Sequence, residues 1–192
     1  EVLENIKTMN IRTPLIYGGG ISSVFSAKKV IALGADRIIL ESVVEKDFIE
    51  FKRITDAIGS QSIIVSMPVS INNKNELIYY DYKKREEKKI SKNLINAIDN
   101  NLFSELILID YKNQGLMKGF NQKILKIFPY KIPLILYGGI YGEKNIKNIL
   151  KYKRVNAVSM GNTLNYSEHS IQKTKSQLTK TYFRKPYYQE II

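Results

Sequence analysis

Short apolar runs alternate with amphipathic segments along most of this chain. The apolar runs have the length of buried strands, whereas the segments between them carry apolar residues every three or four positions, as helices do. The pattern predicts strands at Leu15–Tyr17, Arg37–Leu40, Ser62–Met67, Glu105–Asp110, Leu134–Tyr137 and Asn156–Met160, and helices at 1–10, 23–33, 47–58, 92–102, 121–128, 143–152 and 170–180. Strands that alternate with helices in this way indicate a parallel α/β fold.

One strand–turn–helix–strand unit occurs twice. The first copy begins at Pro14 and ends its first strand in Gly18–Gly20, and the second begins at Pro133 and ends its first strand in Gly138–Gly139. Two such copies are expected for the two halves of an α/β barrel. Six predicted strands are two short of eight, and the chain begins with Glu1 rather than Met. We therefore expect a single barrel domain over 1–192 that is incomplete at its N-terminus, with its first two strands missing.

Residues 71–90 are the most polar part of the chain and interrupt this rhythm. Alternation at Glu76–Tyr82 predicts a β-hairpin, an excursion laid over the barrel mouth, with the charge run Lys83–Lys89 as its solvated tip. The strand before it is expected to end before Pro68, because proline cannot donate a ladder hydrogen bond. Farther on, the loop 111–119 is long enough to close over a ligand.

Composition narrows the choice of ligand. Thirty Lys and Arg against eighteen Asp and Glu give a net charge of +12, which would suit a polyanionic partner. The basic residues are spread over nearly every helix, however, so we expect no nucleic-acid partner and favour a phosphorylated or nucleotide-linked small molecule. No Cys and a single His argue against a metal site. Neither a membrane span nor a signal peptide is visible, so a cytoplasmic protein is expected.

The ends of the predicted strands carry the candidate binding residues. Ligands of α/β barrels bind where the strands end, and glycine amides there can approach an anion closely beside a helix N-terminus. Gly18–Gly20 and Gly138–Gly139 could therefore grip two phosphates on opposite sides of one mouth. Alternatively, these glycines serve only to make tight turns.

Two carboxylates, Glu41 and Asp110, also lie at strand ends and could act as general acid or base. The alternative for each is to cap a neighbouring loop, and the charge of Glu41 would repel a phosphate. His169 lies beyond the last strand, at an expected helix start, and is assigned no catalytic role.

Five motifs together resemble the cyclase (HisF) subunit family of imidazole glycerol phosphate synthase, namely Pro14–Ile21, Gly34-Ala-Asp-Arg, Gly59-Ser-Gln, Glu105–Asp110 with Gly115 and Gly119, and Tyr137-Gly-Gly. The resemblance implies a (βα)8 TIM barrel of the histidine-biosynthesis family. It implies a glutaminase (HisH-like) subunit as partner, which sends ammonia through the barrel to a bis-phosphorylated nucleotide, and no metal or organic cofactor.

Carried over residue by residue, the resemblance implies phosphate contacts at Gly20, Ser42, Gly115, Gly139, Gly161 and Asn162. Gly18, Gly19 and Gly138 remain candidates for phosphate or substrate binding from their position at the strand ends. Arg37 and Glu105, at strand starts, fall where charged residues gate the ammonia. Asp36 falls at the contact with the glutaminase.

The chain also departs from the family pattern. The family's catalytic aspartates end the first and fifth strands, but here the first strand is absent and the fifth-strand position is Pro68. Glu41 stands in place of an asparagine. These departures favour divergent paralogues that, with a glutaminase-like partner, convert acetamido groups on bacterial surface sugars to acetamidino groups. We expect an ammonia-receiving synthase-type subunit of a glutamine-dependent amidotransferase; the alternative is a catalytically inactive scaffold that docks and stimulates a glutaminase.

Overall fold

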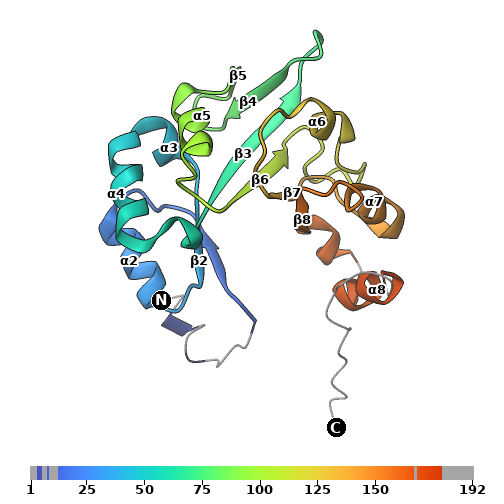
Figure 1. The fold of residues 1–192 in the computed structure, drawn as a ribbon. Helices are drawn as coiled ribbons and strands as arrows, with labels where there is room; N and C mark the ends of the chain where they lie inside the picture. Colours follow the sequence, from blue (N-terminus) through green and yellow to red (C-terminus); the bar gives the residue numbers. More distant parts are fainter. Residues whose placement is uncertain (1–3, 6–7, 9–12, 167, 179–192) are drawn as a thin grey trace.

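The computed structural model describes residues 4–5, 8, 13–166 and 168–178. In this part of the chain one curved sheet has eight strands, of which six are parallel to one another (Figure 1). The parallel strands follow the order β1-β2-β3-β6-β7-β8. Their bounds are β1 Ile16–Gly18, β2 Arg37–Leu40, β3 Ile63–Ile71, β6 Glu105–Asp110, β7 Leu134–Tyr137 and β8 Val155–Val158. The α/β fold class predicted from the pattern is confirmed as a partial barrel.

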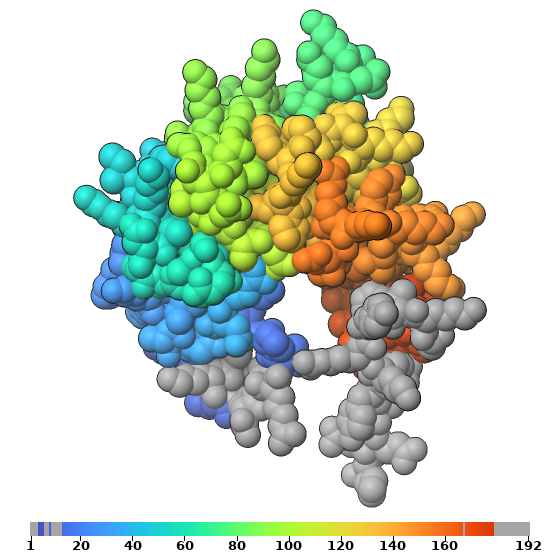
Figure 2. All heavy atoms as spheres, in the orientation of Figure 1, coloured from blue at the N-terminus to red at the C-terminus, as the bar shows by residue number. Residues whose placement is uncertain are grey.

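Helices connect the strands and cover the outer side of the sheet (Figure 1). They are α2 Val24–Ala32, α3 Ser42–Lys46, α4 Phe48–Ile58, α5 Lys92–Asp99, α6 Gln122–Ile127, α7 Gly142–Ile149 and α8 Ser170–Gln177, with 3-10 turns at Ser60–Ser62 and Asn162–Asn165. The repeated unit predicted from the sequence corresponds to β1–α2–β2 and β7–α7–β8, which occupy the two ends of the strand order. Figure 2 shows an opening between the blue and the orange parts of the molecule, to which these units belong.

The two faces of the sheet are buried by different partners, because successive strand residues point to opposite sides. One face packs against the helices and forms the main core, in which Ile38 and Leu40 of β2 lie with Phe51 and Ile54 of α4. The other face forms a second, smaller cluster made only of strand residues, namely Ile64, Ile107 and Ile135, with Ile39, Ile109, Tyr137 and Ala157 packed around them. We call this second side the inner face.

Polar residues next to the helix starts explain why several helices begin where the pattern predicts. Ser23, Asp47, Ser91 and Asn121 each accept a backbone N–H of the first turn that follows. The short helix α3 was not predicted, and α7 ends at Ile149, three residues before the expected end. Most of the predicted helix 1–10 lies outside the described residues.

The prediction that a strand ends before Pro68 is wrong, because β3 continues through this proline to Ile71. Strand β2 pairs with β3 only as far as Val65, and β4 (Leu77–Asp81) begins to pair at Val69. Pro68 therefore lies where one neighbouring strand has ended and the next has not begun, while β6 pairs on the other side. A missing N–H costs little at such a changeover.

Beyond this point the chain turns back on itself. Strand β4 pairs antiparallel with β3, and β5 (Glu86–Lys88) pairs antiparallel with β4. The turn between β3 and β4 is held by Asn72, whose side chain accepts the N–H groups of Lys74 and Glu76. In the described part of the chain, no helix is long and apolar enough to cross a membrane.

Arg154, just before β8, holds the C-terminal end of α6. Its guanidinium donates to the carbonyl oxygens of Leu125, Phe128 (2.9 Å) and Tyr130 (3.1 Å), which would otherwise lack partners at the helix end.

We expect Arg154→Ala to lower the free energy of unfolding by about 2–3 kcal/mol. We expect Arg154→Lys to recover only part of this loss, because an ammonium has no planar fork.

Urea denaturation would measure both variants, with Lys153→Ala as the control at an exposed neighbouring position. The control is expected to stay within about 0.5 kcal/mol of the parent protein. An Arg154→Ala variant as stable as the control would contradict the assigned role.

Candidate functional site

The two glycine turns of the repeated unit share one backbone conformation. Gly19 and Gly138 have φ of 125° and 109°, and Gly20 and Gly139 have φ of 69° and 70°. Residues with a side chain rarely adopt such angles, so glycine is favoured at all four positions for conformational reasons alone. Both turns follow the C-terminal ends of parallel strands, β1 and β7, and therefore lie at the same end of the sheet.

The first turn is open. A Cβ atom added to Gly19 or Gly20 would meet nothing within 4 Å. The turn lines a cavity of ≈ 420 Å³ together with Ser22, Ile39, Glu41, Ser42, Ser66 and Lys83. This cavity is large enough for a small organic ligand. It brings Ser42 and Glu41 together with the glycines as the sequence predicts, and it adds Ser66 and Lys83, which the sequence did not single out.

The second turn is closed by the loop that follows β6. A Cβ atom on Gly138 would lie 2.5 Å from the carbonyl oxygen of Asp110, and one on Gly139 would lie 2.9 Å from that of Gly119. The Gly119 N–H donates to the Gly139 carbonyl at 2.8 Å. The cavity left here is only ≈ 20 Å³, about the room that one water needs. Close packing thus explains why glycine occupies these two positions, without a role in ligand binding.

Three further predicted residues lie at this second turn. Gly115, Gly161 and Asn162 line the small cavity, and the Asn162 amide donates to the Gly115 carbonyl at 3.0 Å. The absence of a Cβ on Gly161 leaves room for the Tyr137 hydroxyl, 2.9 Å from where that atom would be. Phosphate binding at the second turn stays a prediction, and it would need the loop to move.

Helix α2 follows the first turn, and several backbone N–H groups at its start already have acceptors inside the protein. Glu50 of α4 accepts the Val24 N–H at 2.8 Å. The Ser26 hydroxyl accepts the N–H groups of Ser22 and Ser23 at 3.2 and 3.1 Å. A contribution of this helix end to anion binding therefore stays a prediction. An anion in the cavity could also use the amides of the glycine turn, the Ser42 hydroxyl and Lys83.

Glu41 is a half-buried carboxylate at the end of β2. Arg37, Ile39 and Glu41 alternate along this strand, which places Glu41 on the inner face above Ile39. The Ser66 hydroxyl donates to its carboxylate at 2.7 Å. Burial raises the pKa of Glu41; the Ser66 hydrogen bond opposes this shift, and the nearby charge of Asp81 adds to it. Such a carboxyl could accept or donate a proton at the cavity.

Asp110 has a different role. Its side chain is only 1% exposed and lies on the opposite side of β6 from Ile107 and Ile109 of the inner face. It accepts the Asn113 amide at 2.7 Å and the Asn121 N–H at 2.8 Å. Burial raises the pKa of Asp110, and these hydrogen bonds oppose that shift. The contacts fit the loop-capping alternative, in which Asp110 positions the loop 111–119, and its role as acid or base stays a prediction.

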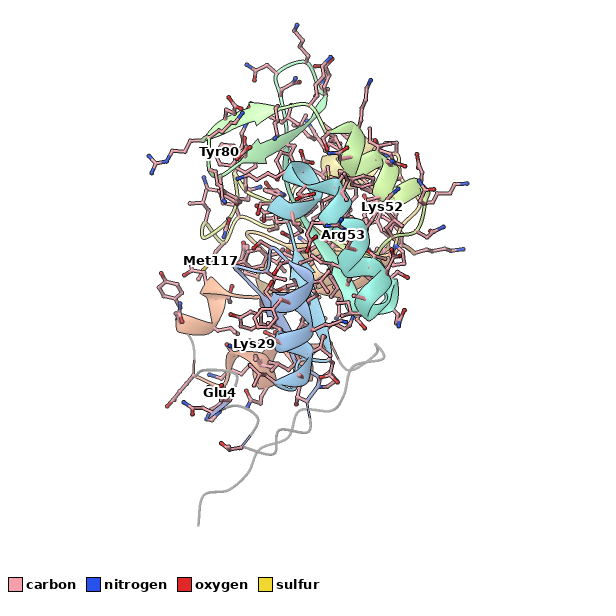
Figure 3. All side chains as sticks on the ribbon, turned by 90° about the vertical axis from the view of Figure 1, so that its left-hand side faces the viewer. Glu4, Lys29, Lys52, Arg53, Tyr80 and Met117 are labelled. Atoms are coloured by element: carbon pink, nitrogen blue, oxygen red, sulfur yellow. The ribbon has the colours of Figure 1, made fainter. Side chains whose placement is uncertain are left out.

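The same loop is also tied to the hairpin. The Tyr80 ring of β4 stacks on Tyr111 with centroids 4.4 Å apart, and the Tyr82 hydroxyl donates to Gln114 at 3.1 Å. Tyr80 and Met117, which belong to the hairpin and the loop, lie on the same side of the molecule (Figure 3). Lys83, in the turn between β4 and β5, reaches the open cavity from this hairpin. The tyrosines that alternate along β4 are the one sequence signal that pointed to this contact.

At the other end of the strands, Arg37 and Glu105 form an ion pair. The Arg37 guanidinium donates to Glu105 and to the Ser104 hydroxyl, and the Asn156 amide donates to Glu105 at 3.3 Å. The two charges that the family resemblance implies for the gate thus lie together, and their gating role stays a prediction; Asn156 was not identified from the sequence. Beside them, Asp36 accepts the Leu15 N–H at 2.7 Å and so connects the starts of β1 and β2.

Metal-ligating side chains do not gather anywhere in the described part of the chain. Groups of three or more His, Cys, Asp or Glu residues suited to a metal ion are absent there. Along the inner face there are thus three features. An ion pair lies at the strand starts, an apolar layer lies in the middle, and a cavity with glycines and Glu41 lies at the strand ends.

Comparison with known proteins connects this arrangement to one family. A family model described as "Histidine biosynthesis protein" matches residues 1–170. An imidazole glycerol phosphate synthase subunit HisF of Methanococcus vannielii is 25% identical over 190 residues, which cover 87% of this chain and 70% of that protein.

Two bacterial relatives carry the same subunit name provisionally. The HisF of Leptospira borgpetersenii is 26% identical over 160 residues, 81% of this chain and 63% of that protein. The hisF2 of Campylobacter jejuni is 33% identical over 129 residues, 66% of this chain and 51% of that protein. The chain thus spans between about half and about two-thirds of the length of these relatives.

The matched glycines Gly20 and Gly139 allow packing to be tested apart from backbone strain. They have almost the same φ, so an alanine at either position carries a similar left-handed cost of about 1–2 kcal/mol. Only at Gly139 does the new methyl also meet Asn113 and Gly119 at 2.9 Å. We expect Gly139→Ala to lower the melting temperature clearly more than Gly20→Ala does, as measured by calorimetry. Equal losses would show that the second turn is as open as the first.

Because Glu41 is half-buried, we expect its replacement by an uncharged side chain to stabilise the protein by an amount that depends on pH. Because its pKa is raised, the folded state favours the protonated form; this stabilisation is present below the ordinary carboxyl pKa and is lost as pH rises through the raised pKa. Glu41→Gln should therefore become more stable relative to the parent protein as pH rises from about 4.5 to 8. Melting temperatures across this range would measure the difference, with Glu86→Gln at an exposed position as the control.

Proposed function

The chain belongs to the histidine biosynthesis protein family, and we propose that it acts as the ammonia-receiving, cyclase-type subunit of a glutamine-dependent amidotransferase. The family relatives include subunits named HisF of imidazole glycerol phosphate synthase. The partner in this proposal is a HisH-like glutaminase, docked at the starts of the strands near Asp36. Ammonia released there would move along the inner face to a substrate in the cavity at the strand ends.

One observation carries the proposal: a single strand, β2, presents all three parts of such a path on one side. Arg37 of the ion pair lies at its start, Ile39 of the apolar cluster in its middle, and Glu41 of the cavity at its end. The ion pair and the cavity therefore lie at opposite ends of the same face. A reactant that enters past the ion pair would arrive at the ligand.

The apolar layer between them suits ammonia in its uncharged form. Its members are isoleucines of neighbouring strands, Ile39, Ile64, Ile107 and Ile135. An ammonium ion would lose its hydration among these side chains at great cost, whereas neutral ammonia would not. The Arg37–Glu105 pair keeps side-chain exposures of 26% and 16%. Because the pair keeps some contact with solvent, its two charges could separate and so open as a gate.

The substrate is proposed to differ from that of the histidine pathway. Pro68 stands at the fifth-strand position where the family resemblance implies a catalytic aspartate, and Glu41 stands where it implies an asparagine. We therefore favour a phosphorylated or nucleotide-linked sugar, whose acetamido group would become an acetamidino group during surface polysaccharide biosynthesis. With this function we propose a cytoplasmic location.

A second candidate is a scaffold that stimulates a glutaminase without chemistry of its own. Asp110 favours it, because this carboxylate holds a loop and faces away from the cavity. Glu41 is then the one carboxylate among the residues that line the open cavity. The two candidates agree on the glutaminase and differ on whether a ligand binds the cavity.

Titration of a HisH-type glutaminase with this protein tests both candidates. We expect complex formation and faster glutamine hydrolysis. Asp36→Asn should weaken the complex several-fold, because it removes a charge from the proposed contact while its amide oxygen can still accept the Leu15 N–H. Glu86→Lys on the distant β5 is the control and should bind as the parent protein does. Without any complex or any stimulation, neither candidate would stand.

A further inference from the structure

Glu41 presents a carboxylate to the open cavity without a cation beside it. Its recorded partner is the neutral Ser66 hydroxyl at 2.7 Å. In the part of the chain that the structure describes, no Lys, Arg or His nitrogen lies within 4.0 Å of its oxygens. A half-buried carboxylate is poorly solvated and gains from a donor in a bound ligand.

The other side of the same cavity has the opposite character. The Gly19–Gly20 turn exposes backbone there, with open space around both glycines, and Lys83 adds a cationic side chain from the hairpin. These groups suit an anion. A purely anionic ligand would be repelled by Glu41 within one cavity of ≈ 420 Å³. A purely cationic ligand would be repelled by Lys83.

We propose that the cavity binds a molecule with both an anionic group and a protonated nitrogen, the anion at the Gly19–Gly20 turn and Lys83, the nitrogen at Glu41. This assignment deepens the proposed function, on which it rests, by naming the class of ligand: a phosphorylated amine or amidine, such as the acetamidino product, since the acetamido nitrogen of the substrate is an uncharged amide. The raised pKa of Glu41 in the empty protein is consistent with it, since a bound cation would favour the ionised carboxylate.

Matched pairs of small phosphates test the assignment by isothermal titration calorimetry. The probes are ω-aminoalkyl phosphates with two, three and four carbons and the alkyl phosphates of the same lengths, so that the pairs differ in the amine alone. We expect the parent protein to bind the best aminoalkyl phosphate about tenfold tighter than its alkyl counterpart, as for one charge-assisted hydrogen bond. Glu41→Gln should reduce that ratio to about one, because it keeps the shape of the side chain and removes its charge.

Two further variants test whether Lys83 contacts the phosphate of the probe and not its amine. Lys83→Gln should weaken both members of a pair by a similar factor and leave their ratio unchanged. Glu86→Gln, the control on β5, should change neither affinity.

The result that overturns the proposal does not depend on whether a variant folds. It is a ratio at or below one in the parent protein for every chain length, or no binding of any probe. An unchanged ratio in a folded Glu41→Gln variant would also overturn it. Glutaminase stimulation without probe binding would remove this inference and leave the scaffold candidate, so the two failures can be told apart.

Discussion

The alternation of side chains along the parallel strands is the constraint on which the rest of this structure depends. Every second residue of β2 enters the core under the helices, as Ile38 and Leu40 do. Helix packing therefore determines which way the intervening residues point. Arg37, Ile39 and Glu41 are left on the inner face, where they form an ordered series of charge, apolar surface and charge. A slip of one residue would bury the two charges and dismantle both ends of the proposed path.

The two glycine turns share one backbone conformation but lie in different surroundings, one open and one filled. Gly20 and Gly139 have nearly identical φ, yet only the first faces open space. At the second turn, Asp110 holds the loop 111–119 over the glycines, and the hairpin tyrosines hold the loop in turn. The barrel symmetry visible in the backbone has therefore been broken by a loop and a hairpin that belong to one half only.

The charges around the open cavity are the basis of the proposal that the ligand differs from a simple bis-phosphate. Glu41 would oppose a second phosphate but would suit a protonated nitrogen, while Lys83 and the glycine amides suit an anion. In the proposed function, this combination would suit a subunit that receives ammonia and attaches it to a phosphorylated compound, because an amidine product would carry a protonated nitrogen near the carboxylate.

The sequence by itself determined the α/β class and the strands β2, β6 and β7 to the residue, because both follow from local periodicity. The charged positions Arg37 and Glu105, which form an ion pair, were implied by the family resemblance and not by the pattern. Only the tertiary structure decided that β3 runs through Pro68, that Asp110 faces a loop, and that the second glycine turn is filled. The reason is physical: each of these depends on which distant segment lies beside the residue, and neither periodicity nor propensity within a segment carries that information.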